Sequence, residues 1–126
     1  MKKWEVWFAD APLEEGGSKP RPVLILDPAT SLVLTFKITS KPPRGNYPAE
    51  YRLLQWREAG LTKPSTVRCS KLLRIPDEDF MDRVSILQLR DIRGVQEVVR
   101  RKLPEYPHLV EKFIPDDDPM FERSIF

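Results

Sequence analysis

Arg21 stands in a segment of the sequence that is suited to holding one side chain in a fixed place. In Lys19-Pro20-Arg21-Pro22, each proline restricts its own φ to about −65° and biases the residue before it toward extended conformations. The Arg21 guanidinium therefore leaves a stiff backbone, and its planar array of N–H donors suits a phosphate or a carboxylate. The alternative is a solvated loop arginine, which is the commoner case. We take Arg21 as the centre of a candidate anion-binding site.

Other polar residues lie on predicted strands or at their ends. Thr39 and Ser40 end a segment in which apolar and polar residues alternate. Arg68 and Ser70 share one face of a predicted strand over residues 65–75. Arginines and hydroxyls without metal ligands suit an oxyanion, most naturally a phosphodiester. The alternative is that Thr39 and Ser40 cap a turn and that Arg68 pairs with a surface acid.

A single cysteine and a single histidine argue against several kinds of catalytic site. Cys69 cannot form an internal disulfide, and with His108 it provides no cluster of metal ligands, so we expect no metal and no other cofactor. Alternation along the predicted strand places Val67 and Cys69 on its buried face. We therefore interpret Cys69 as a core residue and not as a nucleophile.

Short strands joined by proline-rich turns and followed by one helix are predicted along the chain. The 13 prolines favour short elements over long helices. Residues 10–20 and 40–48 are expected to be loops. Strands are expected at residues 3–9, 23–26, 32–39, 50–55, 65–75 and 83–87, and an amphipathic helix at residues 90–102. This pattern predicts a mainly β (α+β) fold, a small barrel with one closing helix.

The net charge of +2 conceals an asymmetry between two parts of the chain. Residues 1–104 carry 19 Lys and Arg against 13 Asp and Glu, whereas residues 105–126 carry 2 against 6. We therefore expect one domain over residues 1–104 with a polyanionic partner, followed by an acidic, proline-containing tail. The sequence has neither an apolar run long enough for a membrane span nor a charged-then-apolar leader, which indicates a cytoplasmic protein without membrane association.

The sequence resembles the MazF/PemK toxin family, the endoribonucleases of bacterial toxin–antitoxin pairs. The resemblance covers roughly residues 3–103, and its strength lies in the order and spacing of several short segments. These segments are Trp4-Glu5-Val6-Trp7, Gly17-Ser18-Lys19-Pro20-Arg21-Pro22-Val23-Leu24-Ile25, Ile38-Thr39-Ser40, and Leu61 followed by Ser65-Thr66-Val67-Arg68-Cys69.

The resemblance implies a fold and a set of partners. The fold would be an SH3-like β-barrel with a closing C-terminal helix. The protein would form a homodimer through a two-fold interface, bind single-stranded RNA in a groove across that dimer, and be neutralised by a cognate antitoxin protein. Cleavage would be independent of metal ions and would use the RNA's own 2′-OH, leaving 2′,3′-cyclic phosphate and 5′-OH ends.

The resemblance also implies roles for particular residues. Arg21, Thr39 and Arg68 would be catalytic, with Arg21 holding the phosphate oxygens and Thr39 donating a hydrogen bond to them. The residues expected to bind the substrate are Lys19, Ser40, Lys41, Arg44 and Ser70.

One departure from the family pattern concerns the proton acceptor. Some members carry an aspartate two residues after the arginine that matches Arg68, whereas this sequence has Ser70, and a hydroxyl is a poor base. Glu14 or Glu15 is our replacement candidate, because other members carry a glutamate in that loop. The alternatives are a catalytically weak or inert module that binds RNA or protein, and a poison of another target such as a topoisomerase, because a related toxin family shares this barrel.

The acidic tail allows a further hypothesis. Antitoxins of this family typically lay an acidic, aromatic-bearing peptide over the RNA groove. Residues 105–126 offer the same chemistry, with Asp116, Asp117 and Asp118 followed by Phe121 and other apolar residues. One hypothesis is that the tail packs on such a groove. The alternative, which we favour, is a tail that is disordered or packed away from the site.

Overall fold

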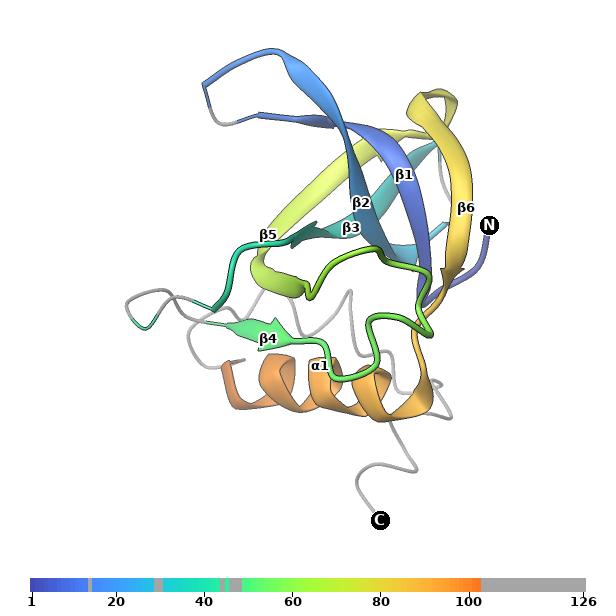
Figure 1. Cartoon of the computed structure of the whole chain (residues 1–126). Coiled ribbons are helices and arrows are strands. Elements are labelled where there is room, and N and C mark those ends of the chain that lie inside the picture. Colours follow the sequence, from blue (N-terminus) through green and yellow to red (C-terminus); the bar gives the residue numbers. More distant parts are fainter. Residues whose placement is uncertain (14, 29–30, 44, 46–48, 103–126) are drawn as a thin grey trace.

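The computed structural model of the chain describes residues 1–13, 15–28, 31–43, 45 and 49–102. Within these residues, six strands and one α-helix confirm the predicted order of elements (Figure 1). They are β1 (Glu5–Pro12), β2 (Ser18–Asp27), β3 (Leu32–Thr39), β4 (Glu50–Arg52), β5 (Thr66–Pro76), a 3₁₀ turn (Asp77–Asp79), β6 (Phe80–Ile86) and α1 (Leu89–Lys102). The expected tail, residues 105–126, lies outside the described residues, so the predicted division into domain and tail stays a prediction.

All six strands pair antiparallel in one sheet, in the order β4-β5-β3-β2-β1-β6. The registers align apolar side chains across the sheet, because Val6 lies opposite Leu24 and Leu24 lies opposite Phe36. Phe36 in turn lies opposite Leu72. Side chains that are directly opposite share a face, so this row continues the apolar face of the sheet from strand to strand.

The main core lies between that face of the sheet and α1. Ile92, Val95 and Val99 of α1 are buried against it, which confirms the apolar periodicity of the predicted helix. Cys69 belongs to the same cluster and is fully buried, as the alternation in β5 predicts. Burial, followed by the charge of Glu50, raises the pKa of the Cys69 thiol, so this side chain packs as a small core residue.

The sheet is open, which corrects the expectation of a closed barrel. In the described strand pairings, β4 and β6 each have one neighbour. Residues 53–65, which we call the β4–β5 connection, run across the space between these two edges. The Ser85 hydroxyl of β6 donates to the Glu58 carbonyl at 3.5 Å, and Gly60 lies directly against Val84. The mainly antiparallel β fold with one C-terminal helix is confirmed.

The segment 10–20, which we expected to be a loop, mostly continues the β1–β2 hairpin. Ala11 lies opposite Lys19 and Pro12 lies opposite Ser18, so β2 begins five residues earlier than predicted. In the described ladder, β3 pairs with β2 only from Val23 to Asp27, so the edge of β2 that faces β3 is unpaired in the hairpin extension. Proline is tolerated there because its missing N–H removes no bond on that edge. Figure 1 shows this hairpin projecting beyond the rest of the sheet.

Asp91, in the first turn of α1, fixes the helix to the β4–β5 connection. Its buried carboxylate accepts hydrogen bonds from the Tyr51 hydroxyl at 2.8 Å and from the backbone N–H groups of Leu54 at 2.9 Å and Gln55 at 2.8 Å. Charge-assisted bonds of this kind are stronger than neutral ones. The end of β4, the start of the connection and the start of α1 are therefore held by one side chain.

Gly94 of α1 is needed because the ring of Tyr51 lies on the helix at that point. A Cβ at position 94 would overlap the Tyr51 ring. That ring is held by its hydrogen bond to Asp91, so it is not free to move aside. The contact explains why a residue that lowers helix propensity by about 1 kcal/mol stands in the middle of α1.

We predict that Gly94→Ala lowers the free energy of unfolding by about 1–3 kcal/mol, because the overlap outweighs the gain in helix propensity. Urea unfolding of the purified protein measures the change. Arg93→Ala, at the exposed neighbouring position, is the matched control and should change stability by less than about 0.5 kcal/mol. A Gly94→Ala variant as stable as the native protein would show that Tyr51 does not press on the helix.

Glu5 joins the N-terminal residues and β1 to β6 through its carboxylate. It is 5% exposed and accepts hydrogen bonds from Arg83 Nε at 2.5 Å, Trp7 Nε1 at 3.1 Å and the backbone N–H of Lys2 at 2.7 Å. Burial alone would raise the pKa of Glu5, but the hydrogen bonds and the charge of Arg83 outweigh it and lower the pKa from its ordinary value of 4.5 to about 2.

We predict that this contact is lost in acid. Because the pKa of Glu5 is lowered in the folded protein, its carboxylate stabilises the fold above about pH 4.5. This stabilisation is lost as the pH falls toward 2, because the carboxylate is then protonated. The contribution is about 1–3 kcal/mol, reduced by solvent because the Arg83 side chain is 48% exposed. Urea unfolding at pH 6 and pH 3 should therefore show a gap between native protein and Glu5→Gln that shrinks on acidification. An equal gap at both pH values would contradict this account.

Candidate functional site

An open pocket of about 260 Å³ lies where β2 and β3 stop pairing. The last paired residues at this end are Val23 and Lys37, and Arg21 and Thr39 each lie two residues beyond them. Val23 and Lys37 are directly opposite, so period-two alternation gives Arg21 and Thr39 the same face of the sheet. Both residues line the pocket. The two strand ends that the sequence singled out therefore meet at one place.

The pocket wall combines residues from three parts of the chain. The β1–β2 hairpin contributes Phe8, Lys19, Pro20, Arg21 and Pro22, and the end of β3 contributes Ile38, Thr39 and Ser40. The β4–β5 connection contributes Gly60, Leu61, Thr62, Lys63 and Ser65. Two sides of the pocket are thus sheet, and the third is a connection whose position depends on Asp91.

Arg21 brings an unsatisfied donor to the pocket. Its Nε is shielded from solvent and has no hydrogen-bond partner among the described residues. A buried donor without a partner costs free energy, so an acceptor at this point would be favoured. The prolines on either side restrict the backbone that carries the guanidinium.

Thr39 is held with its hydroxyl proton available. The residue is 7% exposed, and its Oγ1 accepts a hydrogen bond from the backbone N–H of Lys41 at 3.3 Å. A hydroxyl that accepts through its oxygen can still donate its own proton. Ser40 is exposed and lines the pocket beside it.

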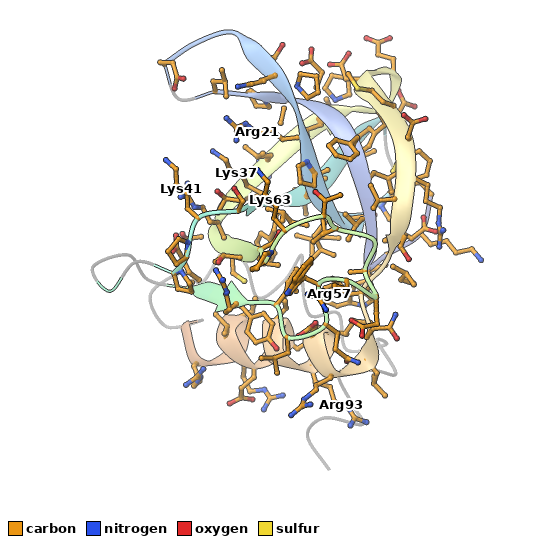
Figure 2. All side chains as sticks on the ribbon, in the orientation of Figure 1. Arg21, Lys37, Lys41, Arg57, Lys63 and Arg93 are labelled. Atoms are coloured by element: carbon orange, nitrogen blue, oxygen red, sulfur yellow. The ribbon has the colours of Figure 1, made fainter. Side chains whose placement is uncertain are left out.

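The pocket is positively charged. Lys19, Arg21 and Lys63 line it, and none of the lining residues that the structure describes is an Asp or a Glu. Figure 2 shows Arg21, Lys37, Lys41 and Lys63 gathered on one side of the molecule, whereas Arg93 lies on α1 at the far end. Overlapping positive charge in a concave site attracts anions and raises their local concentration.

Arg68 is not one of the residues that line this pocket. Its Nε is 3.3 Å from Glu50 Oε2, and the two side chains are only 8% and 3% exposed. The register of β5 is irregular beside it: Phe36 lies opposite Leu72, but the next residue of β3, Lys37, lies opposite Arg68, so three residues of β5 bulge out between them. Ser70 is one of these three and does not line the pocket. Of the two interpretations of Arg68, pairing with an acid matches its position.

The other predicted site residues fall into two groups. Lys41 and Glu15 are exposed and do not line the pocket, although Lys41 follows Ser40 directly. Glu14 and Arg44 lie outside the described residues, so their predicted roles stay predictions.

Sequence reasoning missed Phe8 and the contribution of the β4–β5 connection. A signal for the connection exists, because Lys63-Pro64 repeats the pairing of lysine with proline seen in Lys19-Pro20. The turn is braced: the Ser65 hydroxyl donates to the Lys63 carbonyl at 2.8 Å, and the Leu53 N–H donates to the Ser65 carbonyl at 3.0 Å. What the sequence does not reveal is that this turn comes back to Arg21.

Two other features of the described residues bear on the possible chemistry. No group of three or more His, Cys, Asp and Glu side chains in this part of the chain is arranged to hold a metal ion. None of its helices has the length and apolar character that a membrane crossing requires. The arrangement at the pocket is that of a site for an oxyanion held by guanidinium, ammonium and hydroxyl groups.

Comparisons with known proteins agree with this geometry. Residues 2–103 match the profile of a family described as PemK-like, MazF-like toxin of type II toxin–antitoxin system. The Mycobacterium tuberculosis toxin MazF-mt6 is similar over 78% of this chain and 96% of its own, with a TM-score of 0.59 and 27% identity. An endoribonuclease from mycobacterial species, solved in complex with its cognate antitoxin, has the same fold over 82% of this chain and 95% of its own, with a TM-score of 0.60 and 14% identity.

No curated protein sequence gives a significant match. The family profile nevertheless spans nearly all of the described fold, from before β1 to the end of α1. The chain belongs to the PemK-like, MazF-like family of toxins of type II toxin–antitoxin systems.

Proposed function

We propose that this protein is an endoribonuclease toxin that cleaves single-stranded RNA through attack of the RNA's own 2′-OH on the adjacent phosphorus. The products are a 2′,3′-cyclic phosphate and a 5′-OH. The observation that carries the proposal is that Arg21 and Thr39 line one cation-rich pocket, with a shielded donor on Arg21 that lacks a partner. Family membership and the printed description of one neighbour as an endoribonuclease support it.

Arg21 is proposed to stabilise charge on the phosphorus as the attacking oxygen adds. A guanidinium barely releases protons, so its role is electrostatic and not that of a general acid. Its fork of donors can bind two phosphate oxygens at once. The leaving 5′ oxygen is also stabilised by this positive charge as its bond to phosphorus breaks, and it takes up a proton from water to become the 5′-OH.

Thr39 is proposed to donate its hydroxyl proton to a phosphate oxygen. The hydrogen bond from the Lys41 N–H fixes the position of the Thr39 oxygen and leaves that proton free. Ser40 offers a second hydroxyl, and Lys19 supplies attraction to the RNA backbone. Because these groups supply the positive charge at the phosphate, the proposed reaction requires no metal ion.

The proton acceptor is proposed to come from the turn of the β1–β2 hairpin. No carboxylate lines the pocket among the described residues, and the bulged Ser70 is not there. Glu14 and Glu15 stand in the segment before Arg21, where other members of the family carry a glutamate, so we propose one of them as the base that accepts the 2′-OH proton.

Arg68 takes a different role in this proposal. Its ion pair with Glu50 joins β5 to the edge strand β4, so we assign it to holding the sheet edge and not to contact with the phosphate.

The proposed partners are RNA, a cognate antitoxin and a second copy of the chain. The positive pocket supports a polyanionic substrate. One structural neighbour is described as a complex with its cognate antitoxin, which supports an antitoxin partner here. The homodimer with an SH3-like architecture rests on family membership.

A second candidate function is a module that binds RNA or protein without cleaving it. The specific observation in its favour is the same absence of a carboxylate among the described lining residues. The two candidates share the binding site and differ only in whether a proton acceptor reaches the 2′-OH.

We predict that the purified protein cleaves a long single-stranded RNA in EDTA, and that Arg21→Ala lowers the rate by about 100-fold or more, because it removes the charge that stabilises the transition state. Mapping of 5′-OH ends measures the cleavage. Arg93→Ala, which removes an exposed arginine far from the pocket, is the control and should cleave at the native rate. Cleavage that needs magnesium, or that survives Arg21→Ala undiminished, would exclude this mechanism.

We also predict that one of the two glutamates sets the acid side of the pH dependence. The variant that removes the base, either Glu14→Gln or Glu15→Gln, should lose kcat by about 100-fold and flatten the fall of kcat/KM toward acid pH. The other glutamine variant serves as its matched control. If neither variant changes the profile while Arg21→Ala does, the base lies elsewhere; if none of the proteins cleaves RNA, the binding-module function is favoured.

A further inference from the structure

Lys63 brings a third cation to the pocket, and the proposed function leaves it without a role. It comes from the β4–β5 connection, whereas Lys19 and Arg21 come from β2. Its exposed side chain has no ion pair or hydrogen bond with any residue that the structure describes. An ammonium group held at a pocket mouth without a protein partner is available to a ligand.

The β4–β5 connection presents Lys63 from a braced backbone. Pro64 fixes one φ angle beside it, and the Ser65 hydroxyl bonds the Lys63 carbonyl at 2.8 Å. At the other end of the connection, Asp91 holds the N–H groups of Leu54 and Gln55.

The middle of the connection is fixed as well. Gly60 has a φ of +82°, and a Cβ there would come within 2.7 Å of Val84, so the chain can pass this point only as glycine. The position of Lys63 is therefore a consequence of the fold and not of a mobile loop conformation.

The pocket carries more positive charge than is required to neutralise one phosphate. A phosphodiester carries a single negative charge, and Arg21 with the Thr39 hydroxyl already provides donors for its oxygens. Lys19 and Lys63 add two further positive charges, and no acidic residue is found in the described part of the lining. RNA carries one charge on every successive phosphate, so the surplus fits a second phosphate of the same strand.

Apolar side chains also line the pocket. Phe8 is 39% exposed and lies opposite Pro22, and Leu61 lines the same pocket from the connection. An exposed aromatic ring flanked by apolar groups is a platform for an unpaired base or a ribose. A pocket of about 260 Å³ is at the small end of ligand sites, which suits one nucleotide better than a larger cofactor.

We propose that Lys63 binds the RNA phosphate next to the one held by Arg21 and Thr39, with the intervening nucleotide over Phe8 and Leu61. Lys63 is then a positioning residue: it sets where the strand lies and takes no part in the bond changes. The inference rests on the proposed RNA substrate, and it adds the β4–β5 connection to the substrate-binding surface.

The test measures the salt dependence of binding to a mixed-sequence single-stranded DNA, which has the phosphates and bases but lacks the attacking 2′-OH. Each phosphate contact contributes about 0.7 to the slope of log K against log salt concentration for a single strand. Lys63→Gln should therefore lower the slope by about 0.7, and Lys63→Arg should restore it. Lys2→Gln, at an exposed lysine that does not line the pocket, is the matched control and should leave the slope unchanged.

A double variant shows whether Arg21 and Lys63 bind the same phosphate or two different ones. If Arg21 and Lys63 hold different phosphates, Arg21→Ala with Lys63→Gln should lower the slope by about 1.4. A double variant no worse than Arg21→Ala alone would mean a shared phosphate and would overturn the proposal. A slope unchanged by Lys63→Gln, or lowered equally by Lys2→Gln, would overturn it as well.

Cleavage kinetics, together with the salt dependence of binding, separate this inference from the proposed nuclease activity. On cleavable RNA, Lys63→Gln should raise KM by about 5–10-fold with kcat within about 3-fold of native, whereas Arg21→Ala lowers kcat. Arg21-dependent cleavage with an unchanged Lys63→Gln slope overturns the Lys63 assignment alone. A native protein that binds the strand but cleaves no RNA overturns the nuclease alone, and one that does neither overturns both.

Discussion

The end of pairing between β2 and β3 is the constraint on which the site depends. Pro20 and Pro22 have no N–H to donate, and β2 pairs with β3 only from Val23 onward. Beyond that residue the two strands part, and a pocket opens with Arg21 on one side and Thr39 on the other. The same prolines that end the ladder also stiffen the backbone of Arg21. One local feature of the sequence thus creates the space and orients the charge in it.

The remaining wall of the pocket is held by tertiary contacts. The Asp91 carboxylate ties the start of α1 to the end of β4 and to the β4–β5 connection, and Gly60 allows that connection to pass against β6. Because of these contacts the connection ends at Lys63 on the pocket rim. The buried hydrogen bonds of Asp91 at the start of α1 therefore help to place Lys63 at the pocket. The same residue contributes to the stability of the fold and to the binding surface.

The features that could be predicted from the sequence are those set by neighbouring residues in the chain. Arg21 and Thr39 could be assigned to strand ends because alternation and proline are local signals. Phe8 and Lys63 were missed because their place in the pocket depends on the hairpin extension and on Asp91, which joins residues 36 and 37 positions apart. The ion pair of Arg68 could not be predicted, because its partner Glu50 is 18 residues away in the sequence and is brought opposite it only by the pairing of β4 with β5. The closed barrel was wrong because pairing between the edge strands is replaced by a connection without strand structure.

The central claim is that one phosphate is held jointly by the Arg21 guanidinium and the Thr39 hydroxyl. A crystal structure of the protein with a short RNA whose 2′-OH groups are replaced by hydrogen tests it most directly. The account predicts a phosphate within about 3 Å of both side chains, at the place where β2 and β3 part. A strand bound elsewhere on the molecule, or a phosphate that contacts only one of the two, would contradict it.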